Sequence, residues 1–262
     1  MIRLPFRQRR ALGQHFLVDE NIVRVAGRLA ELSRDDVVLE VGPGLGVLTR
    51  LLADEASFVH AVEIDWSLDP HLRQLFATRK NVDVVFGDAL DLPLADLRPE
   101  PTKFVANLPY NVATPLVAES LDGLPTVQLW CVMVQREVAD RFFAKPGTKS
   151  YGAVSVLVQL TAERTGFHPV SRTVFRPPPN VDSALVAFRR RRTWGPEFAR
   201  VKRVVRAAFS HRRKTLANSL ALAGVSKRDD AEAALTEIGH PPGARAETLV
   251  PDEFIRLAEL VA

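Results

Sequence analysis

Residues 36–52 read DVVLEVGPGLGVLTRLL, and this stretch decides the fold class of the chain. A β-branched apolar run is followed by a glycine-rich turn and then by apolar residues at helical spacing. This order predicts a strand, a tight loop and a helix. Such a loop brings backbone amides and a helix N-terminus close to a ligand.

The glycines of this loop follow an acidic residue. Glu40, Gly42, Gly44 and Gly46 form the pattern acidic-x-Gly-x-Gly-x-Gly, whereas the dinucleotide fingerprint would need its third glycine at Val47. The NAD interpretation is therefore weakened. The pattern is typical of the class I fold that binds S-adenosylmethionine. A lone glycine loop is a weak signal, but acids further along the chain support it.

Two carboxylates end the next two apolar runs. Glu63 follows the run 58–62, at the spacing where an acidic residue meets a ribose diol in doubly wound folds. Asp88 follows the run 82–87 and is placed to accept the adenine amino group of the cofactor. Each acid alone is more often a solvated loop charge. Open α/β sheets bind ligands at the C-terminal ends of their strands, however, so the repeated placement favours a site.

The tetrapeptide Asn107-Leu108-Pro109-Tyr110 follows a fourth apolar run, residues 103–106. An exocyclic amino group on a nucleobase is a poor nucleophile, because its lone pair is delocalised into the ring. The Asn107 side-chain oxygen and the Leu108 carbonyl can accept its two N–H bonds. Pro109 would fix the turn, and Tyr110 offers a flat face on which the base can stack. The same residues also end strands in ordinary turns, and that alternative stays open.

These motifs carry a resemblance to a known family. The chain resembles the small-subunit ribosomal RNA adenine N6,N6-dimethyltransferases, which form one superfamily with the erythromycin-resistance methyltransferases. The resemblance runs from LGQHFL at 12–17 through the glycine loop and NLPYN at 107–111 to FRPPPNVDS at 175–183. RRKTLANSL at 212–220 and RAETL at 245–249 resemble the C-terminal domain of the dimethyltransferases rather than that of the resistance enzymes. The resemblance covers nearly the whole chain.

The resemblance implies roles for particular residues. Tyr110 and Phe175 would sandwich the target adenine, with Asn107 and Leu108 at the reacting amine. Many relatives have Asn at the position of His15. The resemblance therefore implies a contact from the Leu17 backbone to the cofactor more firmly than a contact from the His15 side chain to its methionine end. Trp66 stands where the family has a polar or basic residue, and a ring covering the edge of the adenine pocket or of the sheet explains it best. The residues implied for the cofactor site are His15, Leu17, Gly42, Gly44, Glu63, Asp88 and Asn107.

The charge of the chain favours a nucleic-acid partner. The net charge is +4, the sequence pI is about 9.5, and arginine far outnumbers lysine. Arginine suits bidentate phosphate contacts and base stacking, although an arginine-rich proteome would give the same composition.

Basic residues concentrate near the C-terminus. Residues 189–192 are an unbroken basic run, and a helical stretch follows with the apolar positions Phe198, Val201, Val204, Val205 and Ala208. Its cations are expected to face outward, either as a solvated face or as an rRNA-binding surface. These cations are Arg200, Lys202, Arg203, Arg206, Arg212, Arg213 and Lys214, of which Arg206, Arg212, Arg213 and Lys214 are the RNA-binding candidates.

The fold class predicted is α/β, a class I S-adenosylmethionine-dependent methyltransferase with a Rossmann-like, mainly parallel sheet and helices on both faces, plus a small all-helical C-terminal domain. Residues 1–192 would form the N-terminal arm and catalytic domain, and residues 193–262 the rRNA-binding domain. A helix is expected over Asn21–Leu32. The run 184–188 would be the last strand, antiparallel as in the class that this chain resembles, and the helical region has stops at Gly224 and Pro241-Pro242.

Several features limit the remaining possibilities. Cys131 lies in the apolar run 127–134, which is typical of a buried parallel strand, and has no second cysteine to pair with. The six histidines show no metal-ligand spacing, so no metal site is predicted. No apolar stretch approaches the roughly twenty residues of a membrane helix, and residues 1–10 lack a signal-peptide core. A cytoplasmic monomer is expected.

The resemblance implies transfer of methyl groups from S-adenosylmethionine to N6 of two adjacent adenosines in the 3'-terminal hairpin loop of small-subunit (16S) rRNA, twice per base, during small-subunit biogenesis. The target must be unpaired or flipped out to reach such a pocket. Three alternatives remain: a large-subunit rRNA methyltransferase of the erythromycin-resistance type, a non-catalytic ribosome-assembly or transcription factor, and a small-molecule or protein methyltransferase.

Overall fold

The computed structural model of the protein describes residues 14–211 and 213–261. These residues form two compact units. The first contains the described residues up to Ala139 together with Arg164–Arg190. The second contains Asp140–Glu163 and the described residues from Arg191 on. The sequence placed residues 140–163 in the first domain, whereas the structure groups them with the helical second unit; the functional division at residue 192 stays a prediction.

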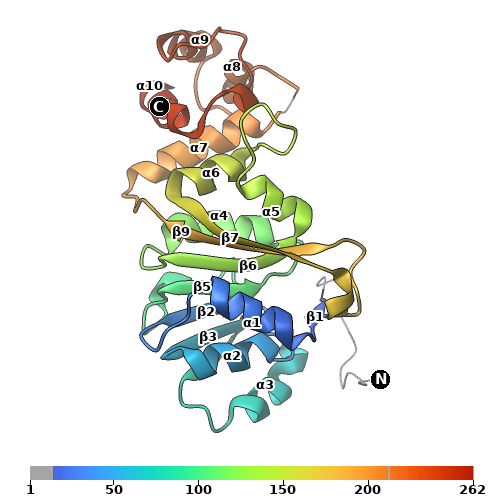
Figure 1. The fold of residues 1–262 in the computed structure, drawn as a ribbon. Coiled ribbons are helices and arrows are strands. Elements are labelled where there is room, and N and C mark those ends of the chain that lie inside the picture. Colours follow the sequence, from blue (N-terminus) through green and yellow to red (C-terminus); the bar gives the residue numbers. More distant parts are fainter. Residues whose placement is uncertain (1–13, 212, 262) are drawn as a thin grey trace. The chain divides into compact units, whose positions relative to one another are not determined.

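A seven-stranded sheet forms the centre of the first unit (Figure 1). The order is β4-β3-β2-β5-β6-β9-β7, and the five strands from β4 to β6 are parallel. β9 runs antiparallel to β6, which confirms the predicted direction of the last strand. The strands are β2 (Val37–Val41), β3 (Phe58–Glu63), β4 (Val82–Phe86), β5 (Lys103–Asn107), β6 (Leu129–Gln135), β7 (Ala162–Val170) and β9 (Ser183–Arg190).

Helices cover both faces of this sheet. Val105 and Cys131 belong to the core cluster that includes side chains of α1 (Glu20–Leu29) and α2 (Val47–Glu55). Because side chains alternate along a strand, Trp130 points to the opposite face, where its Nε1 donates to the Ser120 hydroxyl of α4 (Ala113–Gly123) at 2.9 Å. Burial raises the pKa of Cys131 to about 12, so this thiol is inert core, as predicted.

Two further helices follow strands of the sheet in the chain. α3 (Asp69–Phe76) follows β3, and α5 (Arg136–Phe142) follows β6. The predicted helix Asn21–Leu32 is observed as α1, which begins one residue earlier because the Asp19 side chain accepts from the Asn21 amide at 2.8 Å. It ends early because the chain turns at Glu31, whose φ is 50°.

A two-stranded sheet joins the N-terminal segment to the FRPPPNVDS stretch. β1 (Phe16–Leu17) pairs antiparallel with β8 (Phe175–Arg176), and Leu17 lies opposite Phe175. This pairing brings residues 14–17 next to the ends of the parallel strands.

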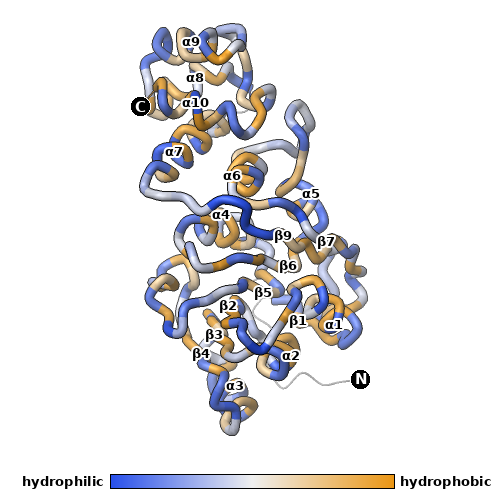
Figure 2. The backbone as a smooth tube through the Cα atoms, turned by 60° about the vertical axis from the view of Figure 1, so that its left-hand side comes forward, coloured by the Kyte–Doolittle hydropathy of each residue, from blue (hydrophilic) through white to orange (hydrophobic). Residues whose placement is uncertain are grey.

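The second unit is mainly helical. In α7 the apolar positions 198, 201, 204, 205 and 208 are all buried, as predicted, and Figure 2 shows hydrophobic and hydrophilic segments alternating along this helix. Lys202 is an exception to the predicted outward cations, because it is only 8% exposed. α8 and α9 end just before Gly224 and Gly239, whose φ angles are 64° and 92°. The helices are α6 (Ala153–Thr161), α7 (Glu197–Phe209), α8 (Leu216–Leu222), α9 (Arg228–Glu237) and α10 (Pro251–Val261).

Neither unit has a helix, within the described ranges, that is long and apolar enough to cross a membrane.

Candidate active site

The glycine loop has backbone angles that disfavour other residues. Gly42 and Gly44 have φ angles of 77° and 55°. A Cβ atom on Gly44 would lie 3.0 Å from the Phe16 ring, so the N-terminal segment approaches the loop too closely for a side chain. The Phe16 ring therefore packs directly against the backbone of the loop at Gly44.

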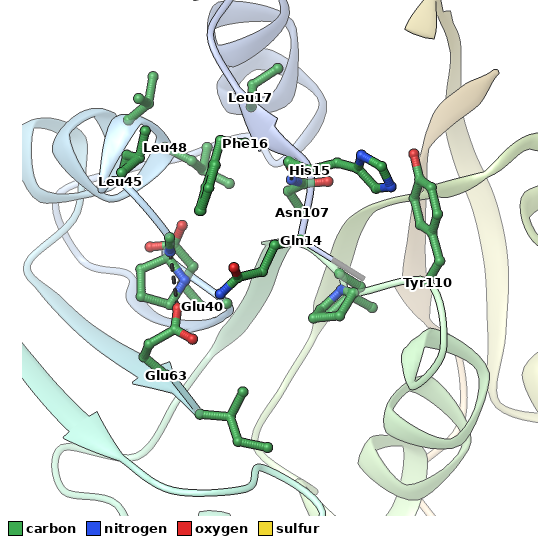
Figure 3. Close-up of a pocket in the computed structure, with 17 residues that line it drawn as sticks. Gln14, His15, Phe16, Leu17, Glu40, Leu45, Leu48, Glu63, Asn107 and Tyr110 are labelled. Carbon is green, nitrogen blue, oxygen red and sulfur yellow. Dashed lines mark hydrogen bonds between the residues drawn. The ribbon is translucent and has the colours of Figure 1, made fainter. Parts of the chain in front are cut away.

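A cavity opens beside this loop in the first unit (Figure 3). Its walls come from the N-terminal segment, the glycine loop, the end of β3 and the NLPY turn. The lining includes most of the predicted site residues: His15, Leu17, Gly42, Gly44, Glu63, Asn107, Leu108 and Tyr110.

A second cavity adjoins the first. The two share Gly42, Glu63, Ile64 and Pro109, and the second reaches Asp88. Asp88 accepts from the Leu90 amide at 2.9 Å. The predicted ribose and adenine acids therefore line two neighbouring cavities at the ends of β3 and β4.

Glu63 is held firmly at the end of β3. Its Oε2 accepts from the Gly44 amide at 3.1 Å and its Oε1 from the Asp65 amide at 2.9 Å. Burial raises the pKa of Glu63, and these amide hydrogen bonds partly oppose the effect. Gln14 reaches the same place, because its Nε2 donates to Asp65 at 2.7 Å. The N-terminal segment is thus tied to the strand end that carries Glu63.

Glu40 is a site residue that the sequence did not single out. It lines the cavity, is 1% exposed, and its Oε2 has no hydrogen-bond partner among the described residues. Burial raises its pKa to about 8; the nearby Thr49 hydroxyl lowers it somewhat and the Glu63 carboxylate adds to the rise. Its only sequence signal was its place as the acid that opens the glycine pattern.

Asn107 and Leu108 are fixed where β5 ends. The Asn107 Nδ2 donates to the His15 carbonyl at 3.2 Å, which leaves Oδ1 as the free acceptor of that amide. The Leu108 amide donates to the Met133 carbonyl of β6 at 3.0 Å, and the Leu108 side chain is buried. Both predicted acceptors are therefore anchored by neighbouring segments.

Tyr110 and His15 stand side by side at the other end of the cavity (Figure 3). Their ring centroids are 5.5 Å apart at an interplanar angle of 31°. The Tyr110 hydroxyl lies 2.5 Å from the Ser183 hydroxyl, and the His15 Nδ1 lies 2.9 Å from the Pro177 carbonyl, to which it must donate. Burial raises the pKa of Tyr110, so it stays a neutral phenol.

Phe175 does not line either cavity. Its side chain is fully buried in the core cluster with Leu17, its partner across the β1–β8 pair. The predicted stacking of Phe175 on the target adenine has no support in this arrangement, because strand pairing turns the ring into the core. Trp66 is 63% exposed and packs on Phe86 of the edge strand β4, with 5.0 Å between the two ring centroids. Its ring therefore covers the edge of the sheet.

The predicted RNA-binding residues belong to the second unit. Arg206 is exposed on α7, and Arg213 and Lys214 are exposed after it, whereas Arg212 lies outside the described residues. No group of three or more His, Cys, Asp or Glu side chains in the described parts of the chain is placed to hold a metal ion.

The sheet order, the glycine loop and the acids at successive strand ends define a class I methyltransferase. The chain belongs to the ribosomal RNA adenine dimethylase family, whose model matches residues 5–262. S-adenosylmethionine is the methyl donor of this family.

Individual relatives cover almost the entire chain. A ribosomal RNA small subunit methyltransferase A from Rubrobacter xylanophilus is 47% identical over 251 residues, which are 96% of this chain and 94% of the relative. A protein of the same name from Streptomyces coelicolor is 47% identical over 268 residues, covering 97% and 90%.

Two solved structures are similar over the whole length. A dimethyladenosine transferase from Plasmodium falciparum superposes with a TM-score of 0.72 at 25% identity, covering 93% of this chain and 96% of that one. The 23S rRNA methyltransferase ErmE gives a TM-score of 0.65 at 33% identity, covering 94% and 99%.

Proposed function

We propose that this protein transfers methyl groups from S-adenosylmethionine to N6 of two adjacent adenosines in the 3'-terminal hairpin loop of small-subunit rRNA, twice per base. The observation that carries the proposal is the anchored pair of acceptors, Asn107 Oδ1 and the Leu108 carbonyl, beside the cofactor cavity. The relatives named small subunit methyltransferase A support the choice of RNA.

The cavity fits S-adenosylmethionine. The unpartnered Oε2 of Glu40 matches an ammonium group such as that of the methionine moiety, and Gly42 and Gly44 add no side chains to the part of the cavity wall that they form. Glu63 is positioned to accept the ribose hydroxyls and Asp88 the adenine amine. The residues proposed to hold the cofactor are His15, Leu17, Gly42, Gly44, Glu63, Asp88 and Asn107. When bound, S-adenosylmethionine supplies a methyl group on a sulfonium leaving group.

The chemical task of the chain is to present a poor nucleophile in a reactive form. Asn107 Oδ1 and the Leu108 carbonyl accept hydrogen bonds from the two N6–H groups, which localises the lone pair on nitrogen. Their anchoring by His15 and Met133 means that little reorganisation is needed during the reaction. Each transfer makes N6 cationic, and the nitrogen then releases one proton to water. After the first transfer N6 therefore keeps one hydrogen, and one acceptor suffices for the second. No covalent intermediate is required.

The second unit is proposed to bind rRNA through its exposed cations. Arg206, Arg213 and Lys214, with Arg212 outside the described residues, would contact backbone phosphates and carry little base specificity. We also propose that the protein acts as a monomer in the cytoplasm on a maturing small subunit.

A large-subunit target is the second candidate, because ErmE is 33% identical to this chain. The higher identity to the small-subunit relatives, 47%, favours the first. The test is to incubate the protein and S-adenosylmethionine with purified, unmethylated small and large subunits and to read rRNA fragments by mass spectrometry. Dimethyladenosine is expected in the small-subunit fragment from the 3'-terminal loop. Methylation of the large subunit alone would select the second candidate, and methylation of neither would support an assembly factor.

A further inference from the structure

We infer that Ser183 is a positioning residue for the target adenine and acts through the ring of Tyr110. The inference rests on the proposed function, because it concerns the base that the protein would methylate. It gives the FRPPPNVDS stretch the role of orienting the Tyr110 ring, in place of the predicted role of stacking Phe175 on the target adenine.

Ser183 is itself held rigidly. It is the first residue of β9, lies opposite Gln135 of β6 in the antiparallel pair, and is 1% exposed. Its hydroxyl lies 2.5 Å from that of Tyr110. The neighbouring Asp182 carboxylate accepts from the Arg172 amide at 3.0 Å. A buried hydroxyl at the start of β9, which lies between β6 and β7 in the sheet, thus fixes the tip of a ring that lines the cavity.

The same stretch fixes a second ring. The Pro177 carbonyl accepts from His15, whose ring lies beside that of Tyr110. Phe175 sits at the other end of the stretch, buried in the core and paired with Leu17. The stretch is therefore anchored in the core by Phe175 and in the sheet by Ser183, and between these anchors it sets both cavity-lining rings.

Holding the Tyr110 ring matters because a tyrosine side chain is otherwise free to rotate about χ1 and χ2. A stacking surface that is already oriented costs less entropy when the base binds and keeps N6 in line with the two acceptors. Loss of the hydrogen bond between Tyr110 and Ser183 is expected to leave the mean position of the Tyr110 ring unchanged but to widen its range of orientations. The effect should fall on turnover and base placement and spare the cofactor half of the cavity.

A double-mutant cycle tests this inference in the full chain. Ser183→Ala, Tyr110→Phe and the double variant are compared in single-turnover methylation of small subunits at saturating S-adenosylmethionine, with S-adenosylhomocysteine affinity measured by calorimetry. Each single variant should slow methylation roughly five- to tenfold, the scale of one hydrogen bond, and the double variant should be no slower than either. Ser183→Thr, which keeps the hydroxyl, should restore most of the rate. Affinity for S-adenosylhomocysteine should not change.

Ser120→Ala is the matched control, because the Ser120 hydroxyl is also buried and bonded to an aromatic side chain, Trp130, away from the cavity. It should lower the melting temperature without slowing methylation. Additive rate losses, or a Ser183→Ala rate equal to the parent's, would overturn the inference while leaving the proposed function intact. A parent protein that methylates neither subunit would instead refute the proposed function and this inference with it.

Discussion

Glu40 illustrates at the scale of the residue how much a position can depend on its surroundings. Sequence reasoning identified Glu63, Asp88 and Asn107 because each follows an apolar run, and all three lie along the cavities. Glu40 lies inside such a run, so only the structure could show that its carboxyl is buried and lines the site. Its raised pKa has a measurable consequence.

The first prediction concerns the pH dependence of stability without cofactor. The ordinary pKa of 4.5 for Glu40 rises to about 8 on folding, so the folded state binds a proton that the unfolded state releases between these values. The stability from this group is complete below pH 4.5 and is lost as the pH rises toward 8, by up to about 1.4 kcal/mol per pH unit. The melting temperature of Glu40→Gln minus that of the parent should therefore be larger at pH 8.5 than at pH 5. If the difference in melting temperature between Glu40→Gln and the parent were the same at every pH in this range, Glu40 would not be buried as described.

At the scale of the element, the parallel core and its helices followed from sequence periodicity, whereas β7 and the β1–β8 pair did not. β7 reads AERTGFHPV, a polar strand with glycine and proline, and local pattern gives no signal for it. The two-residue pair β1–β8 depends on a contact between segments about 160 residues apart, which a local pattern cannot encode. That pair also explains why Phe175, which was predicted to line the site, lies in the core.

A second prediction tests the contact between β1 and the glycine loop. Gly44→Ala must adopt a positive φ and also push its Cβ against Phe16, whereas Gly224→Ala, with a φ of 64°, has nothing within 4 Å. Both should lose about 1 kcal/mol of unfolding free energy for the backbone angle, and Gly44→Ala should lose roughly 1 kcal/mol more for the contact. Only Gly44→Ala should weaken S-adenosylhomocysteine binding, measured by calorimetry. Equal stability losses and unchanged binding in both variants would contradict the close approach of Phe16.

The whole molecule divides the proposed work between two units. The first holds the cavities and the second carries the exposed Arg206, Arg213 and Lys214. The sequence predicted the helical C-terminal region and its buried apolar face. It did not predict that residues 140–163 group with that region, because helices α5 and α6 lie between strands of the sheet in the chain. Strand and helix order along a chain does not reveal which compact unit an intervening helix joins.

The third prediction concerns RNA affinity. Arg213→Ala with Lys214→Ala should weaken binding to small subunits and make the slope of log affinity against log salt less negative by about 1.5, for two lost phosphate contacts. S-adenosylhomocysteine affinity should be unaffected. Arg228→Ala is the control, because Arg228 pairs with Glu232 within α9 and should contribute little. An unchanged salt slope in the double variant would identify these cations as ordinary solvated surface.

The central claim is that Asn107 acts on the target amine as the methyl group is transferred. The most direct measurement is single-turnover methylation of small subunits by the parent and Asn107→Ala at saturating S-adenosylmethionine, with subunit affinity measured in parallel. Turnover should fall roughly a hundredfold or more, the scale of one preorganised transition-state hydrogen bond, while subunit binding changes far less. An Asn107→Ala protein that folds, binds cofactor and dimethylates at the parental rate would contradict the account and reduce the NLPY tetrapeptide to a turn.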